Sequence, residues 1–173
     1  CISVLTDTPS FMGSKEDLDI ARNSSPLPLL RKDFFIDPYQ VFETKYLGGD
    51  CILIILSMLS DSQARELYQT AQEIELDSIF EVHNENEFER ALSMNAKLIG
   101  INNRNLHTFE TDIGTTVNLA SKFSDDLIII SESGIYNNTQ IKMLREKNVN
   151  AFLVGESIIK SDNMTKAIQD LLD

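Results

Sequence analysis

The sequence contains few cysteines, few histidines and no long apolar run. Its two cysteines, Cys1 and Cys51, lie far apart and form neither a disulfide framework nor a metal-binding pattern. The only two histidines, His83 and His107, lack the spacing of zinc ligands. We therefore expect no metal site and no disulfide-stabilised fold, and a cytoplasmic location is the default because the cytosol is reducing.

Positive charge is also scarce. Lys and Arg together number 15 against 27 for Asp and Glu, which gives the 173 residues a formal net charge of −12. Non-specific binding to nucleic acid and docking on anionic lipid both need a basic face, so we expect neither partner. The longest apolar run, Cys51 to Leu56, is far too short to span a bilayer, and no signal peptide is visible. A phosphate site would have to be built locally, from backbone N–H groups and a few cations.

Apolar runs alternate with helix-like segments along the whole chain. The runs begin near residues 2, 28, 51, 78, 97, 127 and 151. Residues that favour a helix N-cap follow most of them, namely Ser14, Asp37, Ser60, Asn84 and either Asn137 or Asn138. Strict alternation of this kind predicts a parallel α/β architecture, and with no visible linker we expect a single domain over residues 1–173.

Two such architectures are possible, a closed eight-stranded barrel and an open doubly wound sheet. An open sheet of the dinucleotide-binding type carries a glycine-rich turn after its first strand, and the sequence has none. Residues suited to chemistry follow nearly every predicted strand: Asp7, Lys32 with Asp33, Ser57, Glu81, Asn102 with Arg104, Glu132 with Ser133, and Gly155. Because all strand ends converge at the mouth of a barrel, we predict a TIM (β/α)8 barrel, of which seven β/α units are visible.

Lys32 ends the second apolar run, on the edge of a strand-to-helix loop. Arg31 and Asp33 flank it, and Asp37-Pro38 begins the next helix. Burying an unpaired ammonium is costly, so Lys32 is either a solvated surface lysine or a site lysine held by a neighbour such as Asp33.

Other polar residues also end predicted strands. Glu81 lies between Phe80 and Val82, and alternation places it on the opposite side from both, where it could act as a general acid or base. The alternative is a solvated loop carboxylate. Glu132 is a candidate for the same reason, and Asn102 serves either the sheet or a ligand.

Glycines follow the last two predicted strands, in Ser133-Gly134 and Gly155-Glu156. In barrels this pair of loops commonly binds phosphate through backbone N–H groups, although simple turn glycines are the alternative. We expect the Glu156 side chain to point away from a phosphate dianion.

Six blocks of the sequence, in order, resemble the indole-3-glycerol-phosphate synthase family. They are Ile2–Asp7, Leu30–Phe34, Glu81–His83, Gly100–Arg104, Ser131–Ile135 and Leu153–Glu156. The resemblance implies a (β/α)8 barrel and a lyase, specifically a carboxy-lyase, in tryptophan biosynthesis. Its small phosphorylated substrate would be 1-(2-carboxyphenylamino)-1-deoxyribulose 5-phosphate, and it would need no metal or organic cofactor.

The resemblance also implies catalytic roles. Lys32 would protonate the substrate carbonyl oxygen during ring closure, and Glu81 would assist proton transfer in dehydration. Asn102 and Glu132 would hold substrate hydroxyls, and Arg104 would line the mouth near the anionic substrate. The residues implied for phosphate binding are Ser133, Gly134, Gly155 and the backbone of Glu156. The residues implied to line the binding site of the anthranilate ring are Phe34, Leu53, Ile55 and Leu106.

The sequence departs from the family pattern at its start. The family's first strand carries a Glu-x-Lys pair followed by Ser-Pro-Ser, after a helix that covers the mouth, and no residues here match them. We therefore expect an N-terminally incomplete barrel with seven of eight units, not competent alone. Two alternatives stay open, another phosphate-binding barrel enzyme and a non-catalytic barrel fragment that acts as an interaction module. The oligomeric state and any fusion to other activities also stay open.

Overall fold

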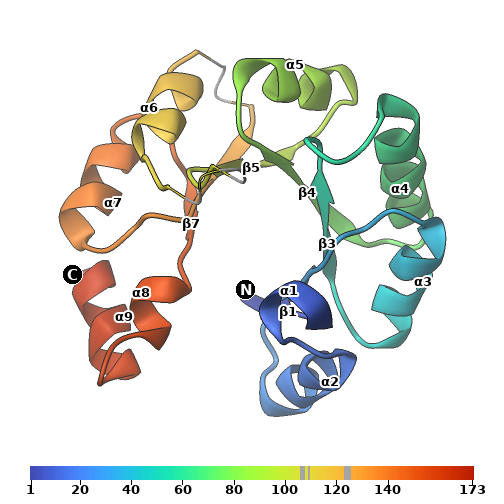
Figure 1. Cartoon of the computed structure of the whole chain (residues 1–173), viewed down its shortest axis with the longest axis horizontal. Helices are drawn as coiled ribbons and strands as arrows, with labels where there is room; N and C mark the ends of the chain where they lie inside the picture. The colour runs from blue at the N-terminus through green and yellow to red at the C-terminus, as the bar shows by residue number, and fades with distance from the viewer. Residues whose placement is uncertain (106–107, 109, 123–125) are drawn as a thin grey trace. The chain divides into compact units, whose positions relative to one another are not determined.

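Each strand is followed by one or two helices in the part of the chain that the structure describes (Figure 1). The structure, a computed structural model, describes residues 1–105, 108, 110–122 and 126–173. These residues fall into two compact units, Cys1–Glu81 and Val82–Asp173. The predicted alternation is confirmed, whereas the single-domain organisation over residues 1–173 stays a prediction.

The strands of the first unit pair in chain order, and every pairing is parallel. They are β1 (Ile2–Leu5), β2 (Leu29–Lys32), β3 (Cys51–Ile55) and β4 (Asp77–Val82). The helices are α1 (Thr8–Phe11), α2 (Lys15–Ser24), α3 (Pro38–Tyr46) and α4 (Asp61–Glu73). Figure 1 shows α2, α3 and α4 along one face of these strands. Every residue of β3 is buried, as expected for a parallel strand that is covered on both faces.

The start of α3 fixes the loop that follows β2. Asp37 is the N-cap and Pro38 the first helical residue, as predicted. Gln40 completes the cap: its Oε1 accepts hydrogen bonds from the N–H groups of Ile36 and Asp37. Its Nε2 donates to the carbonyl of Phe34 at 2.8 Å. The loop between Lys32 and the helix is therefore held by the helix's own first turn.

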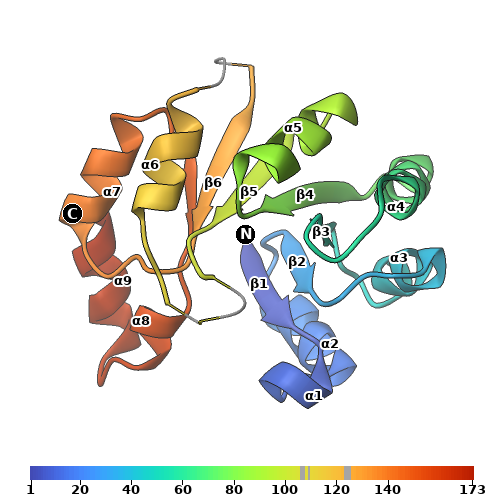
Figure 2. The same ribbon diagram turned by 45° about the horizontal axis from the view of Figure 1, so that its top comes forward.

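The second unit repeats the same arrangement. Its strands β5 (Leu98–Asn102), β6 (Ile128–Glu132) and β7 (Ala151–Leu153) pair in chain order and are parallel. Its helices are α5 (Glu85–Ser93), α6 (Gly114–Ala120), α7 (Asn138–Arg145), α8 (Glu156–Ile159) and α9 (Met164–Leu172). Figure 2 shows α6 and α7 on one side of the strands. Of the two candidate caps for α7, the structure selects Asn137.

The structure differs from the predicted elements in two places. α1 and α8 were not predicted, because helices of four residues are too short to show a helical period. β6 also includes Ser131 and Glu132, the polar residues that follow its apolar run. Its two polar residues continue the ladder, since Ser131 pairs with Ile101 and Glu132 with Asn102.

Candidate active site

An ion pair joins the ends of β2 and β4 in the first unit. The Nζ of Lys32 lies 3.0 Å from the Oε2 of Glu81. The strand register explains the meeting: Arg31 pairs with Ile52, and Ile55 pairs with Glu81. Because side chains alternate, Lys32 and Glu81 share one face of the sheet. The structure therefore brings together two residues that the sequence proposed separately.

The two members of this pair differ in their access to solvent. Glu81 is only 3% exposed, whereas 22% of the Lys32 side chain remains exposed. A buried carboxylate thus stands behind a cation that solvent can reach. Attraction to the buried carboxylate restricts where the ammonium can lie. This arrangement suits a proton donor that must meet a substrate in one position.

Apolar residues of β3 lie between the two charged strand ends, on the same face. Leu53 is 1% exposed and Ile55 is 7% exposed. Phe34 follows Lys32 in the loop, and its ring stacks on Phe11 with centroids 6.2 Å apart. The predicted ring-binding role of Phe34, Leu53 and Ile55 stays a prediction. Leu106, the fourth predicted wall residue, lies outside the described residues.

Asp33 does not have the position that we expected for a residue holding Lys32. Its Oδ2 accepts hydrogen bonds from Nη2 of Arg31 at 2.9 Å and from Oγ1 of Thr6 at 2.6 Å. The physical reason is strand alternation, which turns Arg31 to the face opposite Lys32. Arg31 is 1% exposed, so a carboxylate beside it is needed to compensate a buried charge. Lys32 instead forms an ion pair with Glu81.

In the second unit, Asn102 and Glu132 lie side by side. They are register partners at the ends of β5 and β6, and both are buried, at 8% and 1% exposure. Oδ1 of Asn102 accepts a hydrogen bond of 3.0 Å from the N–H of Arg104, which fixes the amide. An amide and a carboxylate on one face can hold hydroxyl groups of a ligand, and this role of Asn102 and Glu132 stays a prediction.

Sequence reasoning missed Asn103, which organises the loops of this unit. Its Nδ2 donates to Oγ of Ser131 and to the carbonyl of Ser133, both at 3.0 Å. Its Oδ1 accepts from the N–H of Thr116 at 3.1 Å and from Oγ1 of Thr116 at 2.8 Å. Asn103 is 3% exposed and ties the loop after β5 to the loop after β6. The only signal in the sequence was that Asn103 directly follows Asn102. Because side chains alternate along a strand, the second asparagine points to the opposite side from the first.

The loops after β6 and β7 are joined and leave open space at a glycine. Ser133 and Gly134 both have left-handed backbones, with φ of 65° and 71°. Oγ of Ser157 donates to the carbonyl of Ile135 at 3.0 Å and so links the two loops. A Cβ atom built on Gly155 would meet no described atom within 4 Å. The phosphate-binding role of these loops stays a prediction, for which this space offers room.

Glu156 is bound to two cations. Its carboxylate accepts hydrogen bonds from Nζ of Lys160 at 2.6 Å and from Nη2 of Arg104. The hydrogen bond from Lys160 and then that from Arg104 hold the pKa of Glu156 below its usual value. Arg104, predicted to face an anionic substrate, is thus paired with a carboxylate of the chain itself.

Two further findings concern membranes and metals. Within the described part of the chain, no helix is long and apolar enough to cross a membrane. Among the same residues, His, Cys, Asp and Glu side chains form no group of three or more that could hold a metal ion.

Comparisons with known proteins cover almost the whole chain. The family model described as "Indole-3-glycerol phosphate synthase" matches residues 1–171. Curated proteins of that name are 46% identical, over 172 residues in Legionella pneumophila (strain Lens) and over 171 in Polaromonas naphthalenivorans (strain CJ2). Each match covers 99% of this chain, but only 67% and 65% of the respective relative, so the relatives are longer.

A solved structure shows the fold. It is the crystal structure of KGPDC from Streptococcus mutans, with a TM-score of 0.78 and 15% sequence identity. The match covers 99% of this chain and 84% of that one. KGPDC is a TIM-barrel enzyme, so the predicted fold, a TIM barrel with seven of its eight β/α units, is confirmed. With the family model matched from residue 1 to residue 171 and relatives at 46% identity, this chain belongs to the indole-3-glycerol phosphate synthase family, whose enzymes serve tryptophan biosynthesis.

Proposed function

We propose that the protein is a carboxy-lyase that converts 1-(2-carboxyphenylamino)-1-deoxyribulose 5-phosphate to indole-3-glycerol phosphate, CO₂ and water. The observation that carries this proposal is the ion pair between Lys32 and Glu81, with 3.0 Å between Nζ and Oε2. It lies in a chain that matches the family model over residues 1–171. A phosphorylated small molecule is accordingly the partner, and a cytoplasmic location is part of the proposal.

Ring closure is the step assigned to Lys32. The aryl carbon that bears the carboxylate attacks the C2 carbonyl of the ribulose chain, and a carbon–carbon bond forms. The π electrons of the carbonyl move to its oxygen, which takes a proton from the Lys32 ammonium. The bond to the carboxylate then breaks, CO₂ leaves, and the electron pair restores the aromatic ring. A positioned acid lowers this barrier because charge develops on the oxygen in the transition state.

Dehydration is the step assigned to Glu81. The hydroxyl on C2 leaves as water after taking up a proton, and C1 loses a proton, which completes the indole. Glu81 assists these proton transfers from its place beside Lys32. The register partners Asn102 and Glu132 hold the hydroxyls of the glycerol chain, for which their paired positions on β5 and β6 are suited.

The remaining residues bind the two ends of the substrate. The anthranilate ring is assigned to the apolar wall formed by Phe34, which is partly exposed, and by Leu53 and Ile55, which are buried. Backbone N–H groups of the loops at Ser133-Gly134 and Gly155-Glu156 bind the phosphate, which glycine allows to approach closely. The net charge of −12 gives no long-range attraction for an anion, so recognition depends on these local donors.

The direct test is product formation by the protein as its gene encodes it. We expect a fluorescence increase at the emission of indole-3-glycerol phosphate when the substrate is added, with one CO₂ released per product. A Lys32→Met variant serves as the matched control, because it keeps the side-chain length without the proton. A folded wild-type protein that binds the substrate and forms no product would overturn the proposal.

A further inference from the structure

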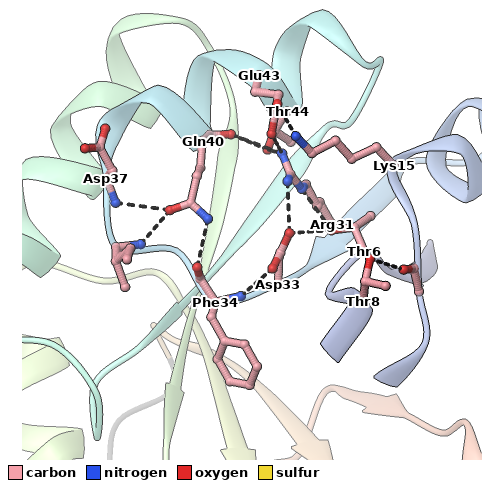
Figure 3. Close-up of polar contacts among 12 residues, drawn as sticks. Thr6, Thr8, Lys15, Arg31, Asp33, Phe34, Asp37, Gln40, Glu43 and Thr44 are labelled. Atoms are coloured by element: carbon pink, nitrogen blue, oxygen red, sulfur yellow. Dashed lines mark hydrogen bonds and ion pairs between the residues drawn. The ribbon is translucent and has the colours of Figure 1, made fainter. Parts of the chain in front are cut away.

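Arg31 is a fully buried cation directly beside the proposed catalytic lysine. It is 1% exposed, and its guanidinium lies in a polar cluster between β2 and α3 (Figure 3). Nε donates to Oγ1 of Thr6 at 3.0 Å, and Nη1 donates to Oγ1 of Thr44 at 3.2 Å. Nη2 and Nη1 also form ion pairs with Asp33 and Glu43, at 2.9 and 3.0 Å. The cluster therefore joins β2, its following loop, helix α3 and the end of β1.

The cluster balances its own charges. Glu43 forms a second ion pair, with Nζ of Lys15 at 2.5 Å. The two cations Arg31 and Lys15 therefore face the two carboxylates Asp33 and Glu43. Oδ2 of Asp33 also accepts a hydrogen bond from Thr6. A buried guanidinium is tolerated only when its donors are occupied in this way. These contacts are made by side chains to which we assign no part in substrate binding, so binding the substrate does not explain the cluster.

Lys32 stands between two residues that are joined across it. Arg31 precedes it and Asp33 follows it, and their side chains form one ion pair. Oδ1 of Asp33 accepts the N–H of Phe34 at 2.8 Å, while the carbonyl of Lys32 accepts the N–H of Thr6 at 3.2 Å. The backbone on both sides of Lys32 is consequently fixed by contacts that do not involve its ammonium.

We propose that Arg31 is a positioning residue for Lys32. By holding Asp33 and α3, its guanidinium keeps the backbone of Lys32 where the ammonium meets Glu81. A catalytic group must be held within a fraction of an ångström of its productive place, and displacement by about 1 Å can cost 10²-fold in rate. This inference rests on the proposed function, because it assigns Arg31 to the acid catalysis of Lys32.

The test compares Arg31→Met with the conservative Arg31→Lys. Methionine removes the charge and all five donors, whereas lysine restores one cation that can reach a single carboxylate. We expect kcat to fall between about 10-fold and 100-fold in Arg31→Met, with KM within about threefold. Arg31→Lys should recover part of kcat.

A matched control comes from another arginine of the same unit. Arg22 donates through Nε to the carbonyl of Gly48 at 2.9 Å and pairs with Asp50, at the ends of the strands opposite Lys32. Arg22→Met should lower the unfolding midpoint and leave kcat unchanged. This control separates a general loss of stability from a loss of positioning.

The decisive measurement repeats Arg31→Met in a Lys32→Ala background. A residue that acts through Lys32 has little further effect on kcat once Lys32 is gone, whereas a merely structural role lowers kcat in both backgrounds equally. Wild-type protein that forms no product contradicts the proposed function itself. If the wild type is active, either of two results overturns the inference. One is a kcat of Arg31→Met within about threefold of wild type, and the other is an equal loss of kcat in both backgrounds. Should Arg31→Met fail to fold, Asp33→Asn weakens the same ion pair with unchanged shape and is judged by the same two outcomes.

Discussion

Lys32 and Glu81 form an ion pair although their strands are not neighbours. β3 lies between β2 and β4, and the Lys32 ammonium reaches over its buried face to within 3.0 Å of the Glu81 carboxylate. The pair thus stands directly above Leu53 and Ile55 on the same face. Under the proposed function, this relationship places the acid of the ring-closure step and a carboxylate on one face of the sheet.

Replacing Lys32 tests the acid in that relationship. Lys32→Ala should lower turnover by about 10²-fold or more, the usual cost of a lost general acid. The readout is the fluorescence of indole-3-glycerol phosphate. Lys45→Ala is the control, since Nζ of Lys45 donates to the carbonyl of Glu75 on the exposed surface. Turnover within about threefold of wild type would remove Lys32 from the chemistry.

Glu81→Gln tests the carboxylate. It keeps the shape of the side chain and removes the proton-transfer function, so kcat should fall while KM changes little. Separate determination of kcat and KM distinguishes the two roles open to Glu81. A raised KM with unchanged kcat would make Glu81 a binding residue and contradict its assigned part in dehydration.

Gly155→Val tests the phosphate loop. A Cβ at this position would meet no described atom within 4 Å, and φ is −125°, so the unfolding midpoint should not change. KM should rise, because a β-branched side chain blocks close approach of the phosphate to the backbone. Gly155→Ala, the smaller substitution, should have a smaller effect, and binding of free anthranilate should hardly change. Crystals soaked in phosphate that hold the anion elsewhere, with these loops empty, would refute the assignment.

Glu156→Gln tests whether Glu156 competes with the substrate for Arg104. The amide keeps the shape and removes the charge that pairs with Arg104 and Lys160, so KM for the anionic substrate should fall at neutral pH. Because the pKa of Glu156 is lowered, the wild-type pairing should persist at pH values below the usual Glu range. Lys160→Met leaves the pairing with Arg104 in place and should not change KM. An unchanged or higher KM in Glu156→Gln would show that no such competition exists.

Glu43 should contribute to the acid sensitivity of folding. Burial raises the pKa of Glu43, but hydrogen bonds from Lys15 and Arg31 and the charges of these two residues lower it by more. The net pKa therefore lies below the usual value. A lowered folded-state pKa gives stability that is complete above the unfolded pKa of about 4.3 and is lost as pH falls through the folded pKa. Urea unfolding at about pH 7 and about pH 3 should therefore show a smaller acid loss in Glu43→Gln than in wild type.

The control for this comparison is Glu16→Gln, which neutralises an exposed carboxylate of α2. It should lose stability in acid as wild type does. Equal acid losses in wild type and Glu43→Gln would show that the cluster around Arg31 does not depend on the ionised carboxylate.

The sequence predicted those features that depend on local pattern. Alternation of apolar runs and caps located the strands and the long helices, and Asp37-Pro38 marked the start of α3 correctly. Position at a strand end also selected Lys32 and Glu81. Their meeting could not be predicted from the residues alone, because it depends on the register of three strands.

What escaped prediction depends on tertiary contacts. Arg31 appeared only as a neighbour of Lys32, since its partners Glu43 and Thr44 lie in the following helix and a single sequence does not show which of its residues face the strand. Asn103 was hidden for the same reason, because its partners are Thr116 of helix α6 and Ser133 of the loop after β6. The four-residue helices α1 and α8 are too short to leave a periodic pattern.

The opposed directions of Arg31 and Lys32 also protect the alignment of β2 during folding. In a parallel sheet, a shift of one residue exchanges the two faces of a strand. Such a shift of β2 would carry the guanidinium away from Glu43 and the ammonium away from Glu81, so two ion pairs would be lost in one step. A strand with only apolar side chains would lose far less stabilising free energy in the same register shift. The two adjacent cations therefore penalise misaligned pairing of β2 with β1 and β3 before any substrate is present.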